Sequence, residues 1–237
     1  MHKPATQRPD APRPGARSLA RLLLVACLSV HLGALGNPAL VTLERRATSA
    51  HGAETGTQVS EWIRMQEEVS ALPPAQQLER TNTFFNRRLR FEDDIEIWKV
   101  KDYWATPIES LSRRAGDCED FAIAKYVTLR LLGVPDDRLR LIYVRAQIGG
   151  PSSGVSQAHM VLGYFETPTA DPLILDNLTG EIRPATRRPD LTPVFSFNSA
   201  GLWVAGASTS AADPTARLSR WRDVLARMQR EGLTLTQ

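Results

Sequence analysis

The residues best suited to chemistry lie in the stretch AGDCEDFAIAKY, residues 115–126, where one cysteine stands among three carboxylates. Gly116 and Asp117 are typical of a helix start, and apolar residues then recur at helical spacing. We therefore expect Cys118 in the first turn of a mostly buried helix, where free backbone N–H groups and the helix dipole stabilise a thiolate. The alternative is a small buried hydrophobe with no reactive role.

A thiolate nucleophile needs a base, and of the four histidines only His159 falls in the predicted core. It stands at the start of an apolar strand, and Asp176 ends the next strand. If these strands are antiparallel neighbours, Asp176 lies beside His159 and orients its imidazole. Each residue alone has a simpler explanation, as a core histidine and a turn residue. The chain order of helix-start cysteine, strand histidine and strand aspartate favours nucleophilic catalysis.

The elements that must position these side chains fall into a helical first part and a later part rich in strands. Thr106, Pro107 and Glu109 form a capping box, which predicts a short helix ending near Arg114. Residues 95–100 are expected to form a short strand or a loop. The remaining expected helices cover residues 59–71, 75–88, 118–131 and 218–228, and the expected strands cover 138–148, 158–166, 172–184 and 194–206. This order predicts an α+β fold, with the helical part packed on an antiparallel sheet.

Composition indicates a globular protein and gives no sign of a nucleic-acid partner. The chain has 237 residues, of which 42% are hydrophobic and 23% charged, which suits one domain with tails. The formal net charge is +3, but residues 1–36 hold five basic residues and one acidic residue. The rest of the chain therefore carries a net charge of −1, which favours no polyanionic partner.

Residues 1–36 are predicted to be a signal peptide. A basic, proline-rich start precedes the apolar run LLLVACLSVHLGALG, and Ala34 and Gly36 supply small residues at the spacing of a cleavage site. The run is short for a membrane span of roughly 20 residues, and an uncleaved anchor is the alternative. Removal of the leader takes away Cys27 and leaves Cys118 without an intramolecular disulfide partner. Residues 37–58 are interpreted as a linker and residues 59–237 as the domain.

The segments GDCEDFAIAKY, SQAHMVLGYF and LILDNL resemble the bacterial transglutaminase-like cysteine peptidases of the LapG type. DYWATP and VFSFNSAGLWVAG extend the resemblance to residues 59–206. It implies a papain-like, transglutaminase-type fold with nucleophile Cys118, base His159 and orienting Asp176. It also implies a periplasmic endopeptidase that cuts a large biofilm adhesin near its N-terminus, at a pair of alanines. The roomy loop GGPSSGVS, residues 149–156, departs from the family and is expected to affect substrate access.

The resemblance further implies calcium dependence and control by an inner-membrane cyclic di-GMP receptor that sequesters the protease. Asp117, Glu119 and Asp120 resemble the calcium ligands of the family, and hard cations take oxygen ligands. Bound calcium offsets the negative charge that raises the pKa of a neighbouring thiol. The alternative is an acidic first turn that only complements the helix dipole.

Two other functions remain open at the level of sequence. The same three residues suit a transglutaminase or amidase that transfers the acyl group to an amine or to water. A module of this fold that only binds a membrane receptor is the non-enzymatic alternative. Retention of Cys118, His159 and Asp176 together favours an enzyme over that module.

Overall fold

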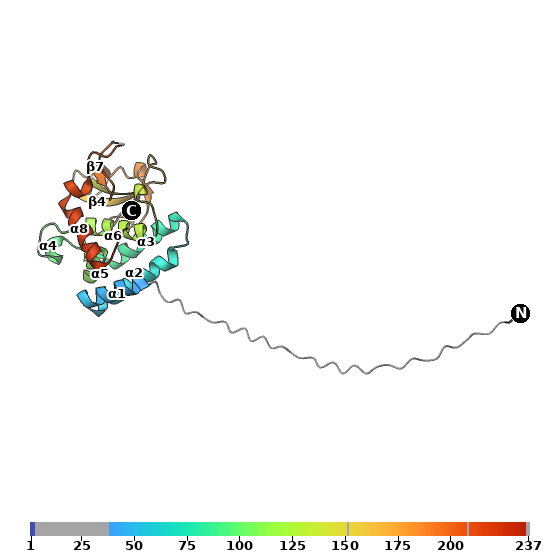
Figure 1. Ribbon diagram of the computed structural model, residues 1–237. Coiled ribbons are helices and arrows are strands. Elements are labelled where there is room, and N and C mark those ends of the chain that lie inside the picture. Colours follow the sequence, from blue (N-terminus) through green and yellow to red (C-terminus); the bar gives the residue numbers. More distant parts are fainter. Residues whose placement is uncertain (3–37, 151, 208, 236–237) are drawn as a thin grey trace. The chain divides into compact units, whose positions relative to one another are not determined.

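The computed structural model describes residues 1–2, 38–150, 152–207 and 209–235 (Figure 1). As predicted, a helical first part precedes the strands of the main sheet, and a C-terminal helix follows them. The predicted signal peptide, apart from residues 1–2, lies outside the described residues. Among the described residues, no helix combines the length and the apolar character needed to cross a bilayer. The described α-helices are α1 (Pro38–His51), α2 (Ala53–Val69), α3 (Pro74–Arg88), α4 (Asp94–Ile97), α5 (Pro107–Arg113), α6 (Cys118–Leu131), α7 (Pro214–Arg217) and α8 (Ser219–Glu231).

Six strands form an antiparallel sheet in the order β6-β5-β4-β3-β7-β8. They are β3 (Leu139–Gln147), β4 (Ser156–Tyr164), β5 (Leu173–Leu175), β6 (Arg183–Pro184), β7 (Leu191–Phe197) and β8 (Leu202–Val204). β3 and β4 pair along their whole length, but β5 pairs only with residues 162–164 of β4. The first part of β4 therefore has an edge that β5 does not cover. Short 3-10 helices, η1 (Asp136–Arg138) and η2 (Ala185–Arg187), precede β3 and follow β6.

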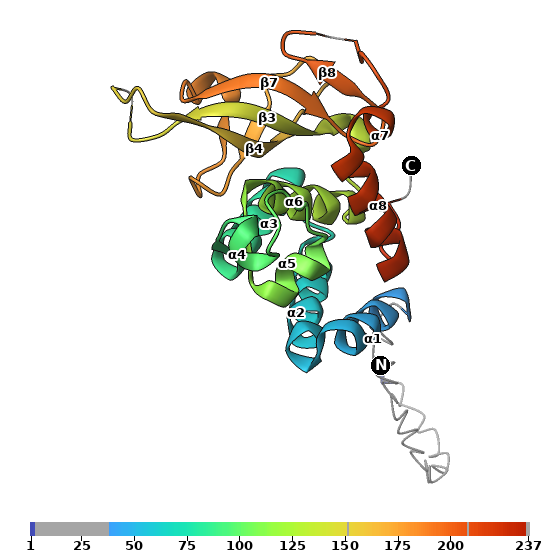
Figure 2. The same cartoon turned by 90° about the vertical axis from the view of Figure 1, so that its left-hand side faces the viewer.

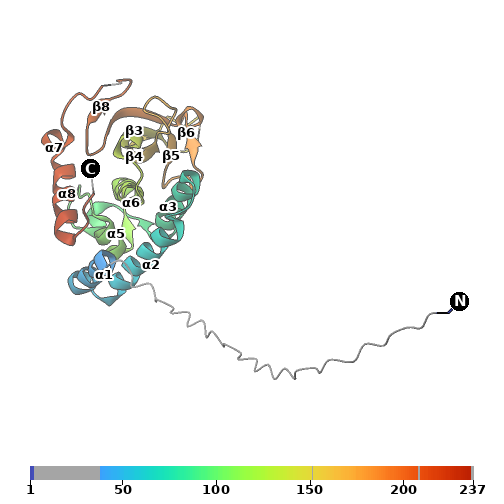
Figure 3. The ribbon, with the colours of Figure 1, turned by 45° about the vertical axis from the view of Figure 1, so that its right-hand side comes forward.

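The sheet covers one side of a helical layer, and α6 runs through the middle of that layer (Figure 2). Viewed nearly along its axis, α6 lies below β3 and β4, between α8 on one side and α3 on the other (Figure 3). Trp221 of α8 meets Tyr126 of α6 edge to face, with ring centroids 5.6 Å apart. Residues of the helices and of the inner sheet face form one continuous hydrophobic core.

The predicted central helix is confirmed as α6. Ten of its 14 residues are buried, and they form an unbroken run from Asp120 to Leu129, so the helix is enclosed on all sides rather than along one stripe. The helix ends before Gly133, whose φ of +88° lies in the left-handed region that favours glycine. α6 thus holds its first residue, Cys118, in a rigid part of the fold.

Two segments differ from the sequence-based expectation. Residues 38–51 form α1, and α2 begins at Ala53, so the segment interpreted as a linker is helical and packed. Leu43 and Ala47 of this segment join the main core. Residues 94–97 form a single helical turn, α4, where a short strand or a loop was expected.

Candidate active site

The nucleophile candidate is fixed at the start of α6 by a tight local arrangement. Residues Ala115–Gly116 form the short strand β2, which pairs in parallel with β1 (Arg90–Phe91). A Cβ atom on Gly116 would lie 2.7 Å from Asp120 Cβ, so only glycine allows this approach to the first turn. Asp117 occupies the predicted cap position with an extended backbone, but its side chain makes no capping hydrogen bond.

His159 and Asp176 lie in direct contact. His159 Nε2 and Asp176 Oδ1 are 2.8 Å apart, and both residues are about 1% exposed. β4 carries the histidine, and the aspartate follows β5 at once, so antiparallel pairing of these strands brings the two side chains together. Because Nε2 is engaged by the carboxylate, Nδ1 is the ring nitrogen that remains for a substrate or a thiol.

Asp176 is held by more than the histidine. Leu178 donates its backbone N–H to Oδ1 at 3.0 Å, and Arg188 donates Nη2 to Oδ2 at 2.7 Å. Asn86 of α3 donates to the backbone oxygen of Asp176 at 2.8 Å. Burial raises the pKa of this carboxyl group, but the bonds from His159, Arg188 and Leu178 outweigh burial and lower the pKa to about 2. The carboxyl group is therefore ionised at neutral pH.

Cys118 and His159 line the same cleft, which has a volume of about 510 Å³. The other lining residues include Trp104, Tyr143 and Gln157. Trp104 lines the cleft and also stacks on the core residue Phe197.

Two opposing effects act on the pKa of the Cys118 thiol. Its Sγ donates to Glu119 Oε2 at 3.0 Å, and burial and then the Glu119 charge raise the pKa of Cys118. A hydrogen bond from the Met160 backbone N–H acts in the opposite direction. Met160 lies on the part of β4 that β5 leaves uncovered. The thiol therefore needs additional positive charge nearby to ionise at neutral pH.

An acidic cluster lies next to the thiol. Single carboxylate oxygens of Asp94, Asp117 and Glu119 lie within 4.8 Å of one another. Two of these residues were proposed from the sequence, whereas Asp94 was missed, although the patch EDD at residues 92–94 was a signal. One carboxylate oxygen of Asp120 is used outside the cluster, because Oδ1 accepts the Ala105 N–H at 2.7 Å. Its role as a ligand stays a prediction.

The cluster has the chemistry of a hard-cation site. Buried oxygens of Asp94, Asp117 and Asp120 lack a hydrogen-bond partner among the described residues. Burial, followed by neighbouring carboxylates, raises the pKa of Asp117 to about 10. Burial also raises the pKa of Asp94 to about 6 and that of Asp120 well above its usual value. Convergent, mutually repelling carboxylates with unpaired oxygens fit a divalent cation such as calcium.

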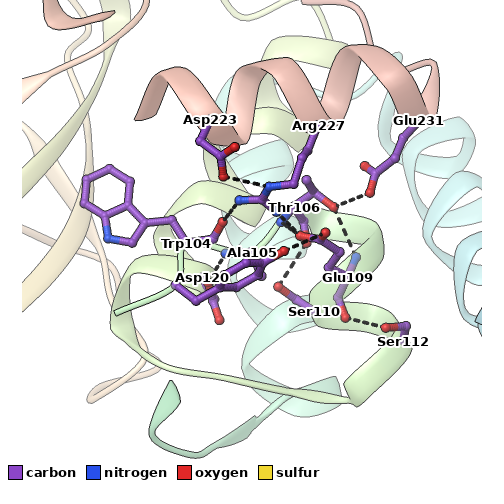
Figure 4. A network of polar contacts seen from close by, with 11 residues as sticks. Trp104, Ala105, Thr106, Glu109, Ser110, Ser112, Asp120, Asp223, Arg227 and Glu231 are labelled. Carbon is purple, nitrogen blue, oxygen red and sulfur yellow. Dashed lines mark hydrogen bonds and ion pairs between the residues drawn. The ribbon is translucent and has the colours of Figure 1, made fainter. Parts of the chain in front are cut away.

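The segment from Tyr103 to Thr106 lies between this cluster and the C-terminal helix, and Figure 4 shows its Trp104, Ala105 and Thr106 between Asp120 and α8. On one side, backbone N–H groups of Tyr103 and Ala105 donate to Asp94 and Asp120. On the other side, Arg227 of α8 bonds the Trp104 carbonyl oxygen, Glu109 Oε2 and Asp223 Oδ2, as Figure 4 shows. The predicted capping box of α5 is confirmed in the same network, with Thr106 and Glu109 bonding reciprocally. α8 therefore holds the segment that carries Trp104 into the cleft.

Substitution of Arg227 by methionine is expected to lower the free energy of unfolding by about 2–4 kcal/mol, because it leaves partly buried Glu109 without its cation. Chemical denaturation monitored by tryptophan fluorescence measures this change. The matched control is Arg220→Met on the same helix, whose ion pair with Asp102 is half exposed. Its expected loss is about 0–1 kcal/mol. Equal losses for the two variants would contradict an anchoring role for Arg227.

The fold and the site define a class of protein. A cysteine at the start of a central helix, packed on an antiparallel sheet that carries a histidine–aspartate pair, is the arrangement of papain-like, transglutaminase-type proteins. The chain belongs to the family described as bacterial transglutaminase-like cysteine proteinase, whose model matches residues 53–204. Its family is thus one of cysteine peptidases.

Solved structures agree with the family assignment. LapG of Legionella pneumophila treated with EGTA is 38% identical, with a TM-score of 0.70, over 80% of this chain and 97% of that chain. The calcium-bound form of the same protein is 37% identical, with a TM-score of 0.69, over 80% and 98% of the two chains. A comparison with curated proteins gave no match.

Proposed function

We propose that this protein is a calcium-dependent periplasmic cysteine endopeptidase with Cys118 as nucleophile, His159 as base and Asp176 as orienting group. The observation that carries the proposal is the buried bond between His159 Nε2 and Asp176 Oδ1, beside a cleft that also contains Cys118. Membership of a cysteine proteinase family supports the same reaction class.

The proposed reaction is acyl transfer through a thioester. The Cys118 proton passes to His159 Nδ1 as Sγ attacks the scissile carbonyl carbon, and Asp176 stabilises the imidazolium through Nε2. Backbone N–H groups of the first turn of α6 stabilise the oxyanion. His159 then protonates the leaving amine, and later accepts a proton from the water that attacks the thioester. Hydrolysis of the thioester restores the thiol.

Calcium is proposed to bind at the acidic cluster of Asp94, Asp117 and Glu119, with Asp120 as a further ligand. Calcium there supplies positive charge beside the thiol and relieves the repulsion between carboxylates. The protein's own contribution is the fixed placement of those oxygens by α4, by the first turn of α6 and by the Tyr103 N–H group. The calcium-bound form of Legionella pneumophila LapG supports this proposal.

The proposed substrate is a large repeat adhesin of the cell surface, cut near its N-terminus at a di-alanine site. Small residues at the scissile bond suit a reacting centre in which His159 is almost fully buried and in which Trp104 and Tyr143 form cleft walls. An inner-membrane receptor for cyclic di-GMP is proposed as the partner that sequesters the protease. Both proposals follow from the resemblance to LapG-type peptidases.

The experiment that tests the proposed function follows cleavage of an N-terminal adhesin fragment that contains the di-alanine site. Cleavage is expected with calcium and is expected to fall to background with a chelator. The control is the same fragment with the two alanines changed to bulky residues, which should remain intact. Absence of cleavage with calcium would contradict the proposed peptidase. Product formation only in the presence of a primary amine would favour acyl transfer to amines instead.

A further inference from the structure

The buried carboxylate of Asp176 requires a permanent positive charge close to it, because an isolated carboxylate is unstable in the interior. Three nitrogen-bearing side chains face it from different elements: His159 of β4, Lys125 of α6, and Arg188, which follows η2. Burial lowers the pKa of Lys125 to about 7, so that its charge is partly lost at neutral pH. Arg188 stays charged throughout the pH range in which enzymes act.

Arg188 is itself fixed in place. It is 5% exposed, and its Nε and Nη2 atoms lie 3.0 Å and 2.8 Å from the two oxygens of Asp190. The same Nη2 atom donates to Asp176 Oδ2 at 2.7 Å. A guanidinium group is planar, so bonds along one edge determine where its other N–H groups point. Asp190 therefore aims Arg188 at Asp176.

The two oxygens of Asp176 are divided between different partners. Oδ2 is bound to Arg188, whereas Oδ1 accepts the Leu178 N–H at 3.0 Å and faces His159 Nε2. Rotation of the carboxylate would break the bond to Arg188. The arrangement leaves Asp176 one orientation, in which Oδ1 holds a proton on Nε2.

We infer that Arg188 is a positioning residue that orients Asp176 and thereby selects the His159 tautomer that carries its proton on Nε2. This tautomer leaves Nδ1 unprotonated, which is the form able to accept the proton of Cys118. No pattern in the sequence indicates this role, since Arg188 stands in the polar run TRRPD. The consequence for catalysis rests on the proposed function, whereas the effect on the tautomer does not.

The test compares Arg188→Met, Arg188→Lys and Asp190→Asn with the unaltered protein. The first variant removes the charge and the planar group, the second keeps the charge, and the third removes the group that aims the guanidinium. Arg183→Met is the matched control, because Arg183 is a solvent-exposed neighbour paired with exposed Glu181. Nitrogen NMR of the His159 imidazole reports the tautomer without any substrate, and peptide cleavage reports kcat and KM separately.

Arg188→Met is expected to lower kcat about a hundredfold, because loss of the guanidinium group misplaces Asp176. KM should change little. Its imidazole spectrum should show a mixture of tautomers, and the acidic limb of its kcat profile should move to higher pH. Arg188→Lys and Asp190→Asn should give intermediate losses, and Arg183→Met none.

A single Nε2–H tautomer in Arg188→Met would overturn the inference. If that variant does not fold, a normal spectrum and normal kcat in both Arg188→Lys and Asp190→Asn would overturn it. If the unaltered protein cleaves no peptide, the proposed function fails, but the tautomer measurement still decides the role of Arg188.

Discussion

Replacement of Cys118 by alanine is expected to abolish peptide cleavage, with a loss in kcat of ~10⁴-fold or more. The alanine variant keeps the cleft and the His159–Asp176 bond but has no atom that can form the thioester. Substrate binding should persist, because the cleft walls are unchanged. A cleavage time course, together with fluorescence titration of the labelled substrate, measures the two effects independently.

A second substitution, His159→Gln, tests whether Cys118 and His159 act together in the reaction. If the two residues act as one unit, the double variant should be no slower than the slower single variant, since neither residue contributes without the other. His159→Gln should also slow modification of Cys118 by a thiol reagent at neutral pH. Multiplicative losses in the double variant would contradict a shared proton transfer, and an active Cys118→Ala protein would exclude the thioester mechanism.

Local patterns predicted the elements that carry Cys118, His159 and Asp176 because the signals for each are short-range. The glycine and acidic residues that begin α6 are adjacent in sequence, and its apolar residues continue for more than three turns. The capping box of Thr106 and Glu109 spans only four residues, and both of its hydrogen bonds are present. Strand alternation and order were then sufficient to place Asp176 beside His159.

The supporting residues could not be found in this way, because their partners are distant in sequence. Asp94 reaches Asp117 and Glu119 only after the chain folds back through α4 and α5. Arg188 meets Asp176 across 12 positions that include β6 and η2, and Arg227 meets Glu109 across 118 positions. A charged residue in a polar run predicts an exposed side chain, and burial by tertiary contacts reverses that expectation.

The failed expectation for α1 and the missing capping bond of Asp117 have physical causes. α1 contributes few core residues, such as Leu43 and Ala47, so tertiary packing rather than a strong sequence pattern orders it. Asp117 has the cap position but uses its carboxylate in the acidic cluster. A residue type that suits a helix start is therefore compatible with a ligand role, and sequence alone does not separate the two.

The second large effect expected is on stability, through the acidic cluster. In chelator, the free energy of unfolding should fall as pH rises from about 4 to about 8. The folded-state pKa of Asp94 is raised from 3.8 to about 6, and that of Asp117 from 3.8 to about 10. A raised folded-state pKa means that the stabilisation is complete below pH 3.8 and is lost as pH rises toward the folded value.

Calcium should reverse this trend. Binding to the folded protein alone stabilises it, by about 2.7 kcal/mol when calcium is at a hundred times its dissociation constant. Protons compete for the same oxygens, so the stabilisation by calcium should grow from about pH 5 to about pH 8. Thermal unfolding in chelator and in millimolar calcium, across this range, measures both slopes. If the curves of stability against pH in chelator and in calcium run parallel, calcium does not bind at the acidic cluster.

Asp117→Asn separates the cation site from an ordinary acidic helix start, because the two readings predict opposite signs. At a cation site, the substitution removes repulsion, so the melting temperature should rise in chelator while the gain from calcium is lost. At an ordinary helix start, loss of a favourable charge should lower the melting temperature in both conditions. Asp93→Asn is the matched control, since Asp93 is exposed and lies outside the cluster. Its response to calcium should equal that of the unaltered protein, so that any general effect of removing a carboxylate near α6 is subtracted.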